Sequence, residues 1–153
     1  MTPEEKISAL GISLAVPPAP LGAYIPVQRA GDLLFLSGIL PLVDGKLLKT
    51  GRVGDQIPAE EGPMLARTVA INALSILKSH LGELGKIKRC VKITGYIASA
   101  AGFTGQAAVL NGASGLMVEV FGEAGRHARA AVGVSVLPLD SPIEVEFIFE
   151  AGE

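Results

Sequence analysis

Two charged side chains in the last third of the chain have the chemistry to act on an acidic small molecule. Arg129 alternates with the small residues Ala131 and Gly133, which leave free space beside its planar guanidinium for two-pronged binding of a carboxylate. Glu144, near the start of the last predicted strand, could hold or activate a water molecule. An ordinary salt bridge or two solvated charges would explain the same spacing, so both interpretations stay open.

Cys90 and His127 are the other reactive candidates. Cys90 lies in a predicted strand on a face shared with two lysines, whose charge could lower a thiol pKa. A packed cysteine is the simpler interpretation. His127 begins another predicted strand and could move protons near neutral pH, but a surface or interface histidine is simpler because no adjacent carboxylate orients it. His80, His127 and Cys90 are the only soft metal ligands and lie on separate predicted elements, so we expect no metal site.

The elements that position these residues follow from hydrophobic periodicity and turn signals. Strands are predicted over residues 23–28, 32–37, 87–97, 127–137 and 143–150, and helices from about 58 to 81 and from a Thr104 cap to Gly122. This β-β-α-β-α-β-β order predicts one α+β domain over residues 21–153. Ahead of it, Thr2 can cap a short helix to about Leu10, and prolines then fix an extended arm, so residues 1–20 form an N-terminal segment.

Alternation in the strand over 127–137 separates an apolar face from the face that carries Arg129 and Ala131. The predicted apolar set is Ala128, Ala130, Val132, Val134 and Val136. If this strand and the next formed a simple hairpin, Glu144 would lie opposite Val136, about 24 Å from Arg129 at about 3.4 Å per residue. Either these two strands are not neighbours, or the carboxylate that works with Arg129 comes from another chain.

Composition excludes several classes of function. The chain has 153 residues, enough for one domain, and its 13 Lys and Arg against 15 Asp and Glu give a net charge of −2, so nucleic acid is not an expected partner. One cysteine excludes an internal disulfide, and Glu4 and Glu5 argue against a signal peptide, so we expect a reducing cytoplasm. No apolar run approaches the roughly 20 residues that cross a bilayer, so no membrane association is expected.

Several short motifs, together with the order of elements, resemble the RidA/YjgF family over about residues 20 to 150. They are Tyr24 in the first strand, Leu36-Ser37-Gly38, Val109-Leu110-Asn111, Ala128-Arg129-Ala130-Ala131-Val132, Leu137-Pro138 and Ile143-Glu144-Val145-Glu146. The step of fifteen residues from Arg129 to Glu144 also matches the family. The sequence departs from the family pattern at Ile39, where glutamine is frequent, and at Ala131, where cysteine is frequent.

The resemblance implies a chorismate-mutase-like fold with two helices packed on one face of a mixed sheet, and a homotrimer with clefts between subunits. It also implies hydrolysis of reactive enamine or imine intermediates of the 2-aminoacrylate type to 2-oxo acids and ammonia. Arg129 would then bind the substrate carboxylate near the amide of Ala131, and Glu144 would position the attacking water. Gly38 would offer a backbone contact, and Tyr24 and Asn111 would line the cleft.

No metal or organic cofactor is implied, because an imine is already activated and the site has mainly to orient it and stabilise charge. Two other functions stay open. One is a ligand-binding or stress-related interaction protein that uses the same clefts without catalysis. The other is the ribonuclease or translation-inhibitor activity often attached to this family, which neither a histidine pair nor a basic stripe supports.

Overall fold

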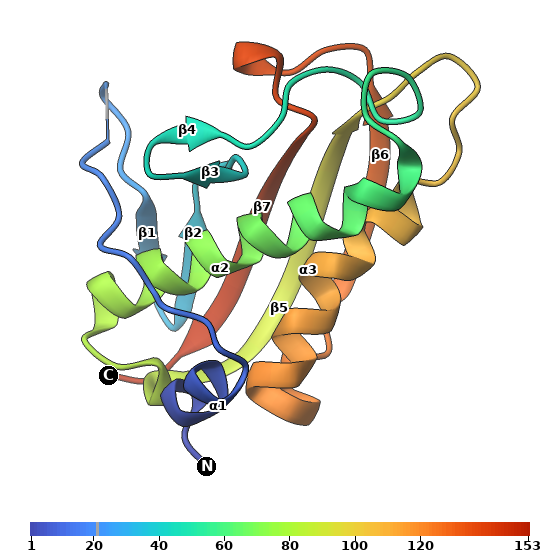
Figure 1. Ribbon diagram of the computed structural model, residues 1–153. Coiled ribbons are helices and arrows are strands. Elements are labelled where there is room, and N and C mark those ends of the chain that lie inside the picture. The colour runs from blue at the N-terminus through green and yellow to red at the C-terminus, as the bar shows by residue number, and fades with distance from the viewer. Residues whose placement is uncertain (21) are drawn as a thin grey trace.

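A five-stranded mixed sheet forms the centre of the chain in a computed structural model that describes residues 1–20 and 22–153 (Figure 1). Its strands are β1 (Val27–Ala30), β2 (Leu33–Leu36), β5 (Ile87–Ala98), β6 (Ala128–Val134) and β7 (Ile143–Ala151). They lie in the order β1-β2-β7-β5-β6; β5 and β6 are parallel and the other neighbours are antiparallel. The predicted α+β class is confirmed.

Two helices cover one face of this sheet, as the family resemblance implied. They are α2 (Gly62–Leu81) and α3 (Gln106–Phe121), and both cross in front of the strands in Figure 1. Fully buried Ile93, Phe147 and Phe149 of the sheet lie in one core with Leu74 of α2 and Leu116 of α3. Within residues 1–20 and 22–153, no helix combines the length and hydropathy of a membrane span.

The starts of both helices differ slightly from prediction. Residues 59–61 form a short 3-10 turn before α2, and Gly105 rather than Thr104 is the N-cap of α3. Within α3 a Cβ on Gly112 would lie 1.8 Å from the Pro63 carbonyl oxygen of α2. The glycine is therefore required by the close approach of the two helix backbones.

The first and second strands are shorter than predicted. β1 starts at Val27 and not at residue 23, because Pro26 has no amide hydrogen to donate to a ladder. Tyr24 consequently lies in the loop before the sheet, and the prediction that it belongs to a strand is wrong. Between β2 and α2 the chain adds a small ribbon, β3 (Leu42–Val43) and β4 (Lys46–Leu47), whose turn at Asp44 and Gly45 has positive φ at both residues.

The two faces of β6 are the reverse of the prediction. Ala131 packs against the core, whereas Val132 is 42% exposed on the face that carries no helix in the part of the chain that the structure describes. Alternation assigns residues to two faces but does not say which face is buried when small and apolar residues occupy both. Arg129 therefore points to the helix side of the sheet, towards α3.

Cys90 also lies on the face opposite to the predicted one. The pairing of β5 with β7 shifts register twice, between Ile87 and Arg89 and again between Cys90 and Lys92. Each irregularity offsets the simple alternation, and Cys90 becomes a buried core residue away from the lysines. The simpler interpretation, a packed cysteine, is confirmed.

β6 and β7 are not neighbours, since β5 lies between them and β6 forms the edge of the sheet. Of the two possibilities left open by the sequence, the first is therefore confirmed. The connection from β6 to β7 passes through a short 3-10 turn at Pro138–Asp140 and returns the chain to the middle of the sheet. In register, Arg129 is aligned with Ile93 of β5, and Glu144 is aligned with Tyr96.

The N-terminal segment begins with α1 (Pro3–Ala9), which Thr2 caps as predicted, and Thr2 and Glu5 form a capping box. Its Glu4 carboxylate accepts a hydrogen bond of 2.6 Å from the Leu84 amide, and Ile7 is buried. The arm then runs beside α2 towards β1 (Figure 1). The proposed boundary between residues 20 and 21 falls at Leu21, which lies outside the described residues.

Candidate functional site

Arg129 lies at the edge of the sheet with its guanidinium held against α3 by neutral groups. Its Nη1 donates to Ser114 Oγ at 3.2 Å and its Nη2 donates to the Ala107 carbonyl at 3.1 Å. In the part of the chain that the structure describes, no carboxylate pairs with this exposed side chain. Its positive charge is thus oriented but not neutralised, which suits the binding of an anion.

A groove of about 330 Å³ runs between α3 and the start of β6 at this position. It is lined by Asn111, Ser114, Val118, Arg126, His127 and Arg129. The first three lie on one face of α3 at helical spacing, and the last two are His127, just before β6, and Arg129, two residues further on. The two arginines make this lining positive, and none of these six residues is acidic.

His127 is oriented from both ring nitrogens. Its Nδ1 lies 2.6 Å from the Gly125 carbonyl oxygen and its Nε2 lies 2.8 Å from Ser114 Oγ. Neither His127 as an oriented group nor Ser114 at all was predicted from the sequence. The available signals were that Ser114 follows Asn111 by one helical turn, and that His127 precedes Arg129 by two residues on the same strand face.

Glu144 and Gly38 meet on another part of the sheet. A Cβ on Gly38 would lie 2.8 Å from Glu144 Oε1, so the glycine provides the space in which the carboxylate lies. Burial, and secondly the negative charge of Glu146, raise the pKa of the Glu144 carboxyl above its ordinary value. The half-buried carboxylate therefore takes up a proton more readily than an exposed one.

Tyr96 and Glu146 extend this acidic cluster and were not predicted as site residues. The Tyr96 hydroxyl donates to Glu146 Oε1 at 2.9 Å, and this hydrogen bond is the main reason why the pKa of Tyr96 is raised. Tyr24, 57% exposed, lies in the loop before β1. Ser37 ties that loop to the end of β2 by donating to the Ile25 carbonyl at 2.7 Å.

The predicted site residues thus form two groups that one chain does not bring together. Arg129, Ala131 and Asn111 belong to β6 and α3, on the helix side of the sheet edge. Glu144 projects from β7 to the opposite face, with β5 between the two strands, and two strand spacings amount to about 10 Å. Gly38 belongs to the Glu144 side of the sheet, and Tyr24 lies in the loop that Ser37 ties to the end of β2.

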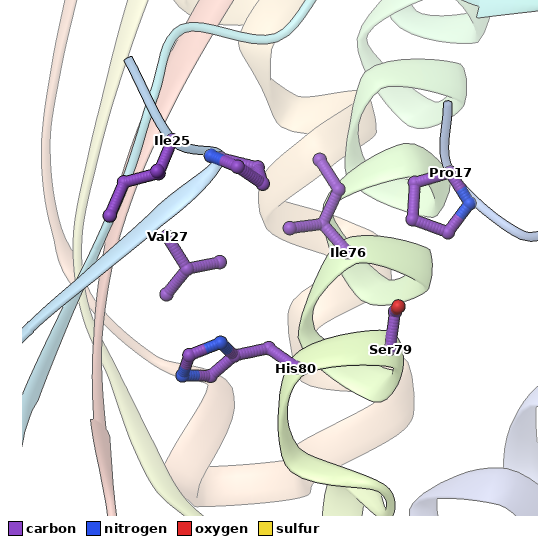
Figure 2. Close-up of a pocket in the computed structure, with 7 residues that line it drawn as sticks. Pro17, Ile25, Val27, Ile76, Ser79 and His80 are labelled. Atoms are coloured by element: carbon purple, nitrogen blue, oxygen red, sulfur yellow. The ribbon is translucent and has the colours of Figure 1, made fainter. Parts of the chain in front are cut away.

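A second groove, of about 420 Å³, lies between the proline-rich arm, the start of β1 and the last turns of α2. Figure 2 shows Ile76, Ser79 and His80 on the helix, with Ile25 and Val27 on one side and Pro17 on the other. Ser79 and His80 are adjacent in the sequence but point away from each other, as consecutive helical residues do. The lining of this groove is mostly apolar.

The surroundings of Cys90 and of the potential metal ligands show what these side chains can do. Burial raises the pKa of the Cys90 thiol to about 12, so this cysteine is unreactive in the folded chain. Among the described residues, no group of three His, Cys, Asp or Glu side chains is placed to hold a metal ion.

The order of strands and the two helices on one face define the class of protein as chorismate-mutase-like α+β. The family model described as "YjgF/chorismate_mutase-like, putative endoribonuclease" matches residues 4–151. The chain belongs to this YjgF/RidA family, as the motifs in the sequence indicated.

Relatives match nearly the whole chain. Protein TCP17 of Trypanosoma cruzi is 40% identical over 145 residues, which are 94% of this chain and 91% of that protein. The crystal structure of the protein Atu1372 from Agrobacterium tumefaciens, described as having unknown function, is 40% identical with a TM-score of 0.91 and covers 98% of this chain and 92% of that one. A "putative endoribonuclease" from Shewanella oneidensis MR-1 is 37% identical with a TM-score of 0.94 and covers 98% and 99%.

Proposed function

We propose that this protein hydrolyses small enamine or imine intermediates that carry a carboxylate, of the 2-aminoacrylate type, to 2-oxo acids and ammonia. The observation that carries the proposal is the un-neutralised guanidinium of Arg129, which two neutral oxygens hold at the edge of a positive groove. A carboxylate bound there would gain charge-assisted hydrogen bonds. The YjgF/RidA family is the context in which this chemistry is expected.

Arg129 binds the substrate carboxylate in this proposal, with the backbone amide of Ala131 nearby and Asn111 on the groove wall. Because β6 is an edge strand, its outer side has no strand partner in the described chain and is open to a ligand. No metal or organic cofactor takes part, since the carbon of an imine is already electrophilic. We place the reaction in the cytoplasm, where amino-acid metabolism produces such intermediates.

Glu144 positions the attacking water in the complete site, with Gly38 and Tyr24 beside it. Since Glu144 lies on the other face of the sheet from Arg129 in the same chain, we propose that a neighbouring subunit supplies it, within a homotrimer that has its clefts between subunits. The helix-free face of the sheet supports association, because it exposes Phe35 and Val132 at 40% and 42%. An active monomer, found by sizing the protein under assay conditions, would contradict the composite site.

The test generates a 2-imino acid in place with an amino-acid oxidase and follows the appearance of the 2-oxo acid. We expect wild-type protein to accelerate hydrolysis above the spontaneous rate, and Arg129→Ala to abolish the acceleration. The matched control is Arg67→Ala, which removes an arginine that pairs with Glu119 on the surface of the two helices. Equal spontaneous and catalysed rates would overturn the proposal.

Two other outcomes identify the alternatives. Binding of a 2-oxo acid that depends on Arg129, without turnover of the imine, would indicate a ligand-binding protein that uses the same groove. Metal-free cleavage of RNA that is lost with Arg129→Ala would indicate the ribonuclease that the Shewanella neighbour's name suggests. The net charge of −2 argues against that second alternative.

A further inference from the structure

Ser114 and His127 form a polarised chain of hydrogen bonds with Arg129. The Gly125 carbonyl can only accept, so Nδ1 of His127 must carry a proton to make the contact of 2.6 Å. In a neutral imidazole this leaves Nε2 as an acceptor, and the only proton available for its 2.8 Å contact is that of the Ser114 hydroxyl. Arg129 in turn donates to Ser114 Oγ.

The imidazole is held by rigid backbone. A Cβ on Gly125 would lie 2.1 Å from the Met117 carbonyl oxygen, so the backbone that carries the acceptor for Nδ1 is packed directly against α3. Ser114 belongs to the same helix. Both partners of His127 are therefore held by α3. The arrangement resembles that of a catalytic nucleophile or proton donor with its base: the Ser114 hydroxyl is the nucleophile or proton donor, the imidazole is the base, and the Gly125 carbonyl orients the base.

The charged groups near His127 come from its own segment of chain. From its own segment it is flanked by Arg126 and Arg129, and Arg126 forms an exposed pair of 3.2 Å with Glu123. The face of α3 that lines the groove contributes the uncharged Asn111, Ser114 and Val118. No carboxylate lines this groove, so among its lining residues the imidazole is the group suited to accept a proton and return it.

We propose that Ser114 and His127 are the proton-transfer pair of the Arg129 groove, an inference that rests on the proposed imine hydrolysis. The reacting form is the protonated imine, an iminium: water attacks its carbon and gives one proton to Ser114 Oγ as the Ser114 proton passes to Nε2 of His127. This step forms a carbinolamine and an imidazolium. The imidazolium proton then returns through Ser114 to the carbinolamine nitrogen. As the carbon–nitrogen bond breaks, the carbinolamine hydroxyl gives its proton through Ser114 to Nε2 of His127. The departing ammonia takes up that proton, so the iminium and water become a 2-oxo acid and an ammonium ion.

This inference assigns a base to the same chain as the carboxylate anchor, whereas Glu144 requires a neighbouring subunit. The two roles are compatible, because a carboxylate can orient the water that an imidazole deprotonates. They differ in their dependence on pH. A histidine base must be neutral to accept a proton, so protonation of His127 in acid should lower the rate of the wild-type protein.

The experiment measures kcat and KM for imine hydrolysis between pH 5 and 8 in wild-type, His127→Gln, Ser114→Ala and Ser114→Thr proteins. We expect His127→Gln and Ser114→Ala to lower kcat about 100-fold with KM changed less than about threefold, and His127→Gln to lose the fall of rate in acid. Ser114→Thr retains a hydroxyl and should recover most of the rate. Thermal unfolding of each variant checks that it is folded.

The matched control is His80→Gln with Ser79→Ala, which removes the serine and histidine of the other groove and should keep the wild-type pH profile. Variants of Ser114 and His127 that keep both kcat and the pH profile, while Arg129→Ala is inactive, would overturn this inference and leave the proposed function intact. An increase in KM with an unchanged pH profile would also overturn it, since it would show that the pair only positions Arg129. A wild-type protein without turnover would overturn both.

Discussion

The two grooves of this protein contain the same reactive residue types in different arrangements. In the Arg129 groove, a serine on α3 and a histidine just before β6 are hydrogen-bonded at 2.8 Å and oriented by a guanidinium and a carbonyl. In the arm groove, Ser79 and His80 are adjacent on one helix and point apart (Figure 2). The difference shows that a hydrogen bond between serine and histidine requires two elements to come together, because adjacent residues on one helix point in different directions.

The two grooves also differ in the charge of the residues that line them. Arg126 and Arg129 line the first, while prolines and aliphatic side chains make up most of the second. A small anion is therefore attracted to the first groove and has no counter-charge among the residues that line the second. The predictions below test this contrast, beginning with the largest expected effect.

Removing the guanidinium should affect the first groove most strongly. Arg129→Ala should lower kcat/KM for imine hydrolysis by at least about 100-fold, because a hydrogen bond to a charged group contributes about 1.5–3 kcal/mol and two such bonds to the carboxylate are lost. Steady-state kinetics with an oxidase-generated imine measures this change. The Arg67→Ala control should stay within about twofold of wild type, because exposed ion pairs contribute little. Similar losses in both variants would show that the effect of Arg129→Ala does not come from binding of the substrate in the groove.

A methyl group at the backbone contact behind His127 should destabilise the fold. Gly125→Ala places its Cβ against the Met117 carbonyl oxygen, and we expect the free energy of unfolding to fall by about 2 kcal/mol. Urea denaturation measures this change. Gly115→Ala is the matched control on α3: only Glu119 Oε1 lies within 4.0 Å of its new Cβ, so it should stabilise by up to about 1 kcal/mol. Equal effects at both positions would show that His127 is not anchored by close backbone packing.

A pH titration extends the comparison to the acidic cluster on the other face of the sheet. Because the pKa of Glu144 is raised in the folded chain, the native state binds that proton more tightly than the unfolded state does. The contribution of Glu144 to stability therefore decreases as the pH rises above the ordinary glutamate value of 4.5. Glu144→Gln should remove this decrease in urea denaturation between pH 4.5 and 7, and Glu60→Gln, an exposed control, should retain it. A wild-type slope in Glu144→Gln would contradict the assignment.

The smallest effect is expected in the arm groove. His80→Gln with Ser79→Ala changes two exposed side chains that do not face each other, so the free energy of unfolding should stay within about 0.5 kcal/mol and kcat/KM within about twofold. Denaturation and imine hydrolysis measure the two quantities. A large loss of activity in this variant would show that the arm groove takes part in catalysis, against the proposed role of the Arg129 groove.

Several features of the fold could be predicted from local sequence alone. The capping box at Thr2, the turn at Asp44 and Gly45, and the two long helices depend on propensities and periodicity within a few turns of chain. The class of fold and the family followed from the order of elements and from short motifs such as the one around Arg129. The individual roles of the six residues proposed from those motifs are still predictions.

Other features required the packed chain. The sequence alone could not predict which face of β6 is buried, the face on which Cys90 lies, or the start of β1 at Val27, because each depends on neighbouring strands, register shifts or a ladder partner. The hydrogen bond between Ser114 and His127 likewise depends on the packed chain, because it joins α3 to the segment before β6.

The sequence by itself determined the order of the main elements and the family, and it led to the proposal that Arg129 binds a carboxylate. The tertiary structure alone decided that Arg129 is held by neutral oxygens of α3, that His127 faces Ser114, and that Glu144 lies across the sheet from both. The physical reason is that propensity and alternation act over a few residues. Side-chain hydrogen bonds between elements depend instead on how β5 separates β6 from β7 and on how closely α3 packs against the edge of the sheet.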